Sequence, residues 1–314
     1  MLRPSPIHHS HARAVRAFYC DHFVLPLPPE HRFPMRKYRL LRERFAGQED
    51  IELGVPAPAS DEQLRRVHTP DYVVRVSDGS LTRTEIRRMG FPWSPELVER
   101  SRRSVGGTIA AGRAALDDGT AANLAGGTHH AFSGHGEGFC VFNDVAVAIR
   151  DIAAAGLARR FYALDLDVHQ GNGTASIFAA DDAVFTLSVH GAKNFPFNKE
   201  VSDLDIELDD GADDQPYLDA VERGVRRASR HGADLAFYVA GADPFVGDRL
   251  GRLSVSKRAL RVRDEIVFEL CQQAGTPVAV VMSGGYAADI TDTVDIHEHT
   301  VRCAASFERL RSPA

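Results

Sequence analysis

Short apolar runs alternate with longer amphipathic stretches from Thr120 onward, and no other feature constrains the fold of this chain as strongly. Each apolar run has the length and bulk of a buried strand. Strands are expected at 121–124, 161–165, 184–189, 235–240 and 278–282, and helices at 144–155, 174–179, 215–230, 256–274 and 288–310. Strands that alternate with helices form a mostly parallel sheet with helices on both faces. The sequence therefore predicts a three-layer α/β/α fold around a mostly parallel central sheet.

The first part of the chain carries weaker signals. Residues 1–60 are rich in proline and predict surface loops with one short helix near 35–45. A short strand is expected at 64–68, before a helix that begins at Thr69 and Pro70.

A long helix is expected to begin at Ser94 and to end near residue 118. Its adjacent glycines, Gly106 and Gly107, lower helix stability, so a close neighbour is expected there. No internal repeat or low-complexity linker interrupts the chain, and we therefore expect one domain over residues 1–314.

Charge and cysteine content argue against several classes of protein. The formal net charge is −6 and the isoelectric point is about 6.2, which argues against a general binder of nucleic acid or anionic membranes. The four cysteines are far apart and form no C-x-x-C pair, as expected in a reducing cytosol. No apolar stretch approaches the ~18 to 20 residues that a membrane span needs, and the first residues lack the apolar core of a signal peptide. We therefore expect a cytoplasmic protein, without a prediction of its oligomeric state.

The stretch from Phe161 to Gly173, FYALDLDVHQGNG, carries the most informative single motif. Its expected strand ends in Asp165, Asp167 and His169, which occupy every second position. Alternate residues of an extended strand point the same way, so the three side chains would share one side and could bind a cation. An acidic strand-to-helix turn with a capping aspartate and a single histidine is the alternative, because the motif is loose on its own.

Other expected strands also end in residues suited to metal binding, and the carboxyl ends of parallel strands meet at one edge of a sheet. Asp243 follows the strand at 235–240 and can join Asp167 and His169 in a three-ligand metal site with open positions for water and substrate. Zn²⁺ suits this ligand set, and Fe²⁺, Mn²⁺ and Co²⁺ remain open.

Three further side chains would complete a hydrolytic site. His129 and His130 follow the strand at 121–124 and could transfer protons. Tyr286 follows the strand at 278–282 and could donate a hydrogen bond to an oxyanion. The set predicts metal-assisted hydrolysis of an amide or an ester.

In their order along the chain, these motifs resemble those of the histone deacetylase-like amidohydrolases of the arginase–deacetylase superfamily. The resemblance extends from His68 to Tyr286 and includes GGTHHA, GFCVFND, DLDVHQGNG, GADPFVGDRLG and SGGY. The stretch GDRLGRLSVS, with the glutamine and asparagine of HQGNG, is most similar to class IV histone deacetylases and their bacterial relatives. The resemblance implies the arginase–deacetylase fold.

The resemblance also implies a role for each site residue. It assigns Asp167, His169 and Asp243 to a catalytic Zn²⁺. It makes His130 the general base and His129 its electrostatic or acid partner.

Further implied roles concern the carbonyl and a second cation. Tyr286 would polarise the scissile carbonyl, where class IIa enzymes carry a histidine. Asp165 would orient His129 and, with Asp167 and Ser188, bind a structural K⁺.

The resemblance assigns the substrate tunnel as well. Gly138 would accept the substrate amide N–H through its carbonyl, and Phe139 and Phe195 would form the aromatic walls around an acyl-lysine. Leu250 would lie at the rim, where polyamine-selective deacetylases carry a glutamate. Thr128 replaces an aromatic residue before the two histidines, which leaves the depth of the acyl pocket open.

Asn172 replaces the aspartate that class I enzymes pair with the second histidine. An asparagine carries no charge, so it should raise the proton affinity of His130 less than a carboxylate would.

The leading hypothesis is a Zn²⁺-dependent deacylase that hydrolyses acyl-lysine amides in proteins or peptides. Class IV resemblance suggests long-chain acyl groups as well as acetyl. The alternative is a small-molecule amidohydrolase that acts on acetylpolyamines or another acylated amine. A third hypothesis is a metal-holding binding module without turnover.

Overall fold

A computed structural model describes residues 14–311, and eight parallel strands form one sheet in it. The strand order across the sheet is β2-β1-β3-β8-β7-β4-β5-β6. The strands are β1 (Val15–Phe18), β2 (Ile51–Gly54), β3 (Thr120–Asn123), β4 (Phe161–Asp165), β5 (Val184–Gly191), β6 (Leu204–Leu208), β7 (Leu235–Val239) and β8 (Val278–Val281). The prediction of an α/β fold with a mostly parallel sheet is confirmed.

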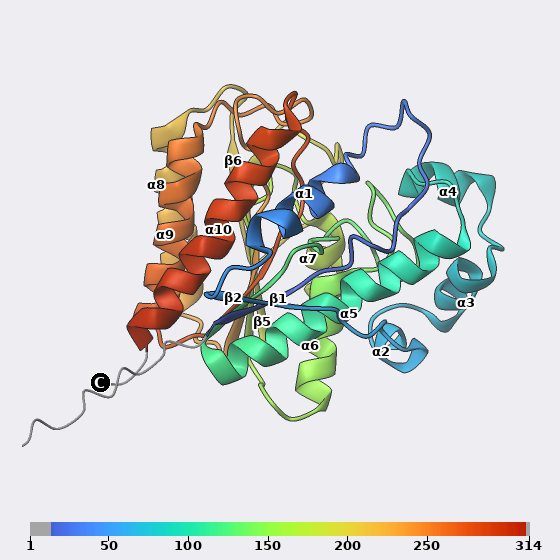
Figure 1. The fold of residues 1–314 in the computed structure, drawn as a ribbon, viewed down its shortest axis with the longest axis horizontal. Coiled ribbons are helices and arrows are strands. Elements are labelled where there is room, and N and C mark those ends of the chain that lie inside the picture. Colours follow the sequence, from blue (N-terminus) through green and yellow to red (C-terminus); the bar gives the residue numbers. More distant parts are fainter. Residues whose placement is uncertain (1–13, 312–314) are drawn as a thin grey trace, which may run out of the picture.

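Helices cover both faces of the sheet (Figure 1). They are α1 (Arg36–Phe45), α2 (Asp61–Arg65), α3 (Pro70–Asp78), α4 (Arg83–Met89), α5 (Pro95–Asp118), α6 (Asp144–Ala154), α7 (Asn172–Phe178), α8 (Asp214–Ser229), α9 (Lys257–Gln273) and α10 (Ile290–Arg311). No helix in the described part of the chain is both long and apolar enough to cross a membrane.

Alternation along the strands divides the core into two layers. Tyr162 and Leu164 of β4 belong to the apolar cluster that includes α1, α8, α9 and α10. Phe161 and Ala163 point to the opposite face and belong to the cluster that includes α5 and α6. Because β4 is buried on both faces, its sequence is a continuous apolar run up to Asp165.

The N-terminal part differs from the prediction of surface loops. Strands β1 and β2 extend the sheet beyond β3, and β6 adds the opposite edge. The strand expected at 64–68 is also wrong, because Leu64 lies in α2 and the chain turns after it. A capping box explains the difference: the Ser60 hydroxyl accepts from the Gln63 backbone N–H at 3.2 Å, and the Gln63 side chain accepts from the Ser60 backbone N–H at 2.9 Å.

Other segments of the chain pass close to the glycine pair of α5, as expected. A Cβ atom at Gly106 would lie 1.8 Å from the carbonyl oxygen of Ala57. A Cβ atom at Gly107 would lie 2.8 Å from the side-chain amide of Asn123 on β3. The helix can therefore pack this close to the sheet and to the preceding loop only without side chains at these two positions.

Candidate active site

A cavity of about 670 Å³ opens at the carboxyl edge of the sheet. The loops that follow β3, β4, β5, β7 and β8 all contribute lining residues, as expected of a parallel α/β sheet. The chain before α1 adds Arg32 and Phe33, and α1 adds Tyr38. The four strand ends that the sequence singled out thus meet at one cavity, together with the loop that follows β5.

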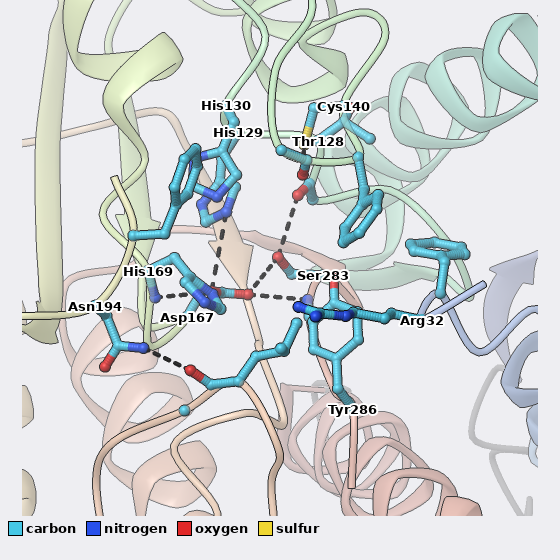
Figure 2. A pocket seen from close by; sticks show the side chains of 18 of the residues that line it. Arg32, Thr128, His129, His130, Cys140, Asp167, His169, Asn194, Ser283 and Tyr286 are labelled. Atoms are coloured by element: carbon cyan, nitrogen blue, oxygen red, sulfur yellow. Dashed lines mark hydrogen bonds and ion pairs between the residues drawn. The ribbon is translucent and has the colours of Figure 1, made fainter. Parts of the chain in front are cut away.

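Asp167 and His169 line this cavity (Figure 2), and Asp243 lies beside them, so that each of the three offers one ligand atom within 4.8 Å of the others. All three are buried. His169 Nδ1 lies 2.9 Å from Asp167 Oδ1 and 3.2 Å from Asp243 Oδ2. The three candidate ligands that the sequence singled out are therefore brought together.

The donor set fits a cation. Asp243 Oδ2 is buried and makes no hydrogen bond with any residue that the structure describes. Space is kept beside it, because a Cβ atom at Gly284 would lie 1.9 Å from this oxygen. The second oxygen of Asp167 is held by the Ser283 hydroxyl at 2.8 Å and the Gly284 backbone N–H at 2.9 Å. Two carboxylates and one imidazole form a ligand set that suits Zn²⁺.

The shifted pKa values in this cluster also indicate a cation site. Burial raises the pKa of Asp243 to about 7, and the neighbouring charge of Asp167 adds to the shift. Burial acts to lower the pKa of His169, but the hydrogen bond to Asp167 and the close carboxylate of Asp243 outweigh it and raise that pKa to about 10. A divalent cation among these groups would take the place of protons.

The tandem histidines lie beside this cluster with different partners. His129 Nδ1 is 2.6 Å from Asp165 Oδ2, whereas His130 Nδ1 is 2.7 Å from the amide oxygen of Asn172. Their ring centroids are 4.0 Å apart. The contact between Asn172 and His130 is the one that the sequence predicted.

These partners separate the two proton affinities. Burial lowers the pKa of His129, but Asp165 and Asp167 override it and raise that pKa to about 9. Burial, with the neighbouring His129 and His169, holds the pKa of His130 well below its usual value. One histidine therefore keeps its proton and the other is free to accept one, which is the pattern of an acid–base pair.

Tyr286 lines the same cavity and extends its ring toward Asp167 and Ser283 (Figure 2). Burial, with the charges of Asp243 and Asp167, raises its pKa well above the usual range and keeps the hydroxyl protonated. Its hydroxyl is thus a candidate hydrogen-bond donor at the cavity floor.

The residues predicted to hold the substrate also line the cavity. Gly138 and Phe139 both have positive φ angles, 56° and 66°. A Cβ atom at Gly138 would lie 2.7 Å from the His130 ring and 2.9 Å from the Phe195 ring, so only glycine fits there. Phe195 packs edge-on against His130 with centroids 4.9 Å apart, and Leu250 lies half-buried in the wall.

The residues predicted to hold K⁺ are neighbours across two strands. Asp165 on β4 is in register with Ser188 on β5. One oxygen of Asp165 accepts from the Asp167 backbone N–H at 3.1 Å, and the Ser188 hydroxyl lies 2.9 Å from His190 Nδ1.

Thr128, which lines the cavity, is held in place by hydrogen bonds to Asp144. Its hydroxyl donates to Asp144 Oδ1 at 2.6 Å, and its backbone N–H donates to the same oxygen at 2.7 Å. Asp144 Oδ2 also accepts from the Gly127 backbone N–H at 3.0 Å, so a buried carboxylate fixes the turn before the two histidines.

Sequence reasoning missed Lys37 of α1, which is buried beside the site. Its ammonium donates to the Ser283 carbonyl at 2.9 Å and lies 5.5 Å from the Tyr286 ring centroid. Burial lowers its pKa to about 8. No spacing pattern marks a single lysine in an amphipathic helix, so the sequence held no signal for it.

The model of the histone deacetylase domain matches residues 30–301 of the chain. The chain is 46% identical to an uncharacterized protein of Picosynechococcus, over 91% of this chain and 97% of that protein. It is 32% identical to histone deacetylase 2 of Arabidopsis thaliana, over 76% of this chain and 66% of that protein. It is 31% identical to a histone deacetylase-like amidohydrolase of Pseudomonas aeruginosa, over 76% of this chain and 67% of that protein.

A similar fold occurs in the crystal structure of a histone deacetylase homologue from Aquifex aeolicus, with a TM-score of 0.80 and 24% identity. That match covers 94% of this chain and 84% of the other.

Proposed function

The chain belongs to the histone deacetylase family of the arginase–deacetylase superfamily, and from this premise we propose that it is a Zn²⁺-dependent lysine deacylase. The substrate is an acyl-lysine in a protein or peptide, and the reaction is hydrolysis of its linear amide. One observation carries the proposal: Asp167, His169, the histidine pair and Tyr286 line one cavity, and Asp243 joins Asp167 and His169 in one buried cluster.

Zn²⁺ bound by Asp167, His169 and Asp243 would act as a Lewis acid that polarises the acyl carbonyl and lowers the pKa of the attacking water. His130 accepts the proton of that water, because its low pKa leaves Nε2 free. His129 stays protonated beside Asp165 and stabilises the negative charge that develops. The Tyr286 hydroxyl donates to the carbonyl oxygen, and a histidine returns a proton to the leaving amine.

The cavity walls orient the lysine chain. Phe139 and Phe195 enclose its methylene groups, and the Gly138 carbonyl accepts the N–H of the scissile amide. Loss of water between these rings strengthens every polar interaction at the floor.

Three finer assignments belong to the same proposal. The GDRLG stretch supports a class IV type of enzyme, for which long-chain acyl groups are substrates besides acetyl. The register of Asp165 and Ser188, together with Asp167, supports a structural K⁺ behind the histidines. All four cysteines are free and buried, which supports the reducing environment of the cytoplasm.

The test is hydrolysis of lysine peptides of graded acyl length, from acetyl to myristoyl, by protein reconstituted with Zn²⁺. We expect amine release with Zn²⁺ and none after chelation. Turnover confined to one small acylated amine would replace the proposal with a small-molecule amidohydrolase. Zinc bound at one equivalent without hydrolysis of any acyl amide would identify a binding module instead.

A further inference from the structure

Positive charge surrounds the mouth of the active-site cavity. Arg32, Lys193, Arg249 and Arg252 all line the cavity, and all four are exposed. Among the described residues that line it, the one carboxylate is that of Asp167, which is buried at the floor. The whole chain has a net charge of −6, so this concentration of cations, which we call the basic rim, is local.

Little of the rim charge is neutralised within the protein. Asp210 forms an ion pair with Arg252 at 3.1 Å and lies 3.9 Å from Lys193. Arg32 and Arg249 form no ion pair with any residue that the structure describes. One carboxylate therefore faces two of the four cations, and the rim keeps a net positive charge.

Hydrogen bonds hold the rim loops in place. The buried Asn194 donates to the Leu250 carbonyl at 2.8 Å and accepts from the Arg252 backbone N–H at 3.2 Å. Asp248 accepts from the backbone N–H groups of Leu250 at 2.8 Å and Tyr286 at 2.6 Å. The segment that carries Arg249 and Arg252 is thus tied to Asn194 and to the backbone of Tyr286.

We propose that the preferred substrate is a peptide in which acidic side chains flank the acyl-lysine. The inference rests on the proposed function, because it assumes that an acyl-lysine enters this cavity. The acyl group then lies at the floor, and the neighbouring peptide residues stay at the mouth, beside the rim. The walls of Phe139 and Phe195 have low polarity and concentrate the field of the cations in the cleft. The same field repels polyamines and peptides rich in lysine and arginine.

The experiment compares blocked pentapeptides with a central acetyl-lysine whose two neighbours are both Glu, both Gln or both Lys. We expect kcat/KM to fall in the order Glu, Gln, Lys, with about a tenfold span at low salt, as for a few exposed charge contacts. The span should shrink at about 0.5 M salt, because exposed charges are screened. Equal values for the three peptides, or a preference for Lys, would overturn the proposal.

Charge-reversed variants locate the effect. The double variant Arg249→Glu/Arg252→Glu should abolish or invert the preference between the Glu and Lys peptides. The control is Arg223→Glu/Arg230→Glu, which changes the net charge equally at a groove beside α8 that shares no lining residue with the active-site cavity. The control should keep the wild-type preference, and a loss of preference in both variants would contradict a local role of the rim.

Two further comparisons distinguish failure of the rim inference from failure of the proposed function. Free Nε-acetyl-lysine and its carboxamide differ only in the α-carboxylate, so a comparison of their kcat/KM values tests whether the rim binds that carboxylate. If the enzyme prefers the free amino acid to its carboxamide but shows no preference among the peptides, the peptide assignment is overturned. Hydrolysis of the Gln peptide tests the proposed function alone. If that peptide is cleaved and flanking charge has no effect, the deacylase proposal stands and the rim inference falls.

Discussion

At the scale of single residues, Tyr286 is positioned by its neighbours before any substrate arrives. Its backbone N–H donates to Asp248, and the Lys37 ammonium lies 5.5 Å from its ring centroid. The hydroxyl is kept protonated because burial and the nearby carboxylates raise its pKa. A donor aimed at the carbonyl oxygen gains most when charge develops there, so it should act on kcat rather than on KM.

Replacement of Tyr286 by Phe tests this role. We expect kcat on an acyl-lysine peptide to fall by about 10²-fold or more, as for loss of one oxyanion donor. Bound zinc, measured by atomic absorption, should stay at one equivalent. Tyr162→Phe is the matched control, because its hydroxyl bonds to the Ser229 carbonyl at 3.2 Å in the helical layer and not to the cavity. Full activity of Tyr286→Phe would contradict the mechanism.

We expect Asn172 to position the ring of His130. Its amide oxygen lies 2.7 Å from His130 Nδ1, so this bond sets which nitrogen faces the substrate. Asn172→Ala should lower kcat about tenfold with little change in KM, because the ring loses its orientation. Asn172→Asp keeps an acceptor oxygen and should recover much of the loss. Steady-state kinetics would speak against this role if the Ala and Asp variants were equally impaired.

At the scale of elements, the glycine pair of α5 decides how close the helix lies to its neighbours. Helix propensity alone predicts that Gly106→Ala stabilises the protein by up to about 1 kcal/mol. The contact with the Ala57 carbonyl oxygen reverses the sign, because a backbone atom cannot move aside cheaply. We expect a net loss of about 1–3 kcal/mol, as for other overpacked sites.

Urea unfolding measures the effect of Gly106→Ala. Gly134→Ala is the control, because a Cβ atom there would meet nothing within 4 Å. If the Gly106 variant were as stable as the Gly134 variant, the chain around Ala57 would have to be more adaptable than its geometry indicates.

The strands that the sequence predicted and those it missed differ in burial. Strand β4 is buried at every position, so its apolar run is visible in the sequence. Strand β1 has four residues and includes Arg16, whose guanidinium reaches Asp118 at 2.6 Å, and this breaks the apolar signal. Strand β6 lies at an edge of the sheet and is only partly buried.

In the candidate active site, too, some residues could be predicted from the sequence and others could not. The candidate metal ligands and the two histidines follow predicted strands, so the order of the motifs was enough to predict that they lie together. The basic rim could not be predicted in this way, because Arg32, Lys193, Arg249 and Arg252 come from three separate segments with no shared spacing. Their common place depends on how the loops close over the cavity, which the hydrogen bonds of Asn194 set only in the folded chain.

At the scale of the whole molecule, a cation at the floor should stabilise the fold, because the cluster of three ligands exists only in the folded state. Zn²⁺ at about 100 times its dissociation constant should add about 2.7 kcal/mol to the free energy of unfolding, and a chelator should reverse this. Thermal unfolding with and without Zn²⁺ measures the shift in Tm.

Two variants locate this stabilisation. Asp243→Asn should remove most of the response to Zn²⁺, whereas Asp219→Asn on α8 should keep it. An unchanged Tm of the wild-type protein on addition of Zn²⁺ would count against a metal site in this cluster.

A buried histidine away from the candidate metal ligands, His68, contributes to the dependence of stability on pH. His68 joins the start of α3 to the loops of the active site: its Nδ1 lies 3.0 Å from the Phe132 carbonyl oxygen, and its Nε2 accepts from the Asn143 backbone N–H at 3.0 Å. Burial lowers its pKa from 6.5 to about 4. Because the imidazole is neutral in the fold, protonation would break the bond to Asn143.

At this residue the unfolded chain binds more protons than the folded one between about pH 6.5 and pH 4, so the contribution of His68 to stability falls as pH drops through this window. One such group contributes a slope of about 1.4 kcal/mol per pH unit, or about 3 kcal/mol across the window. His68→Gln cannot titrate there, so its free energy of unfolding should fall less steeply with decreasing pH than that of the wild type. Urea titrations at half-unit steps from pH 7 to 4.5 measure both slopes. All other groups are common to the two proteins, so parallel curves would show that His68 is not held neutral by the fold.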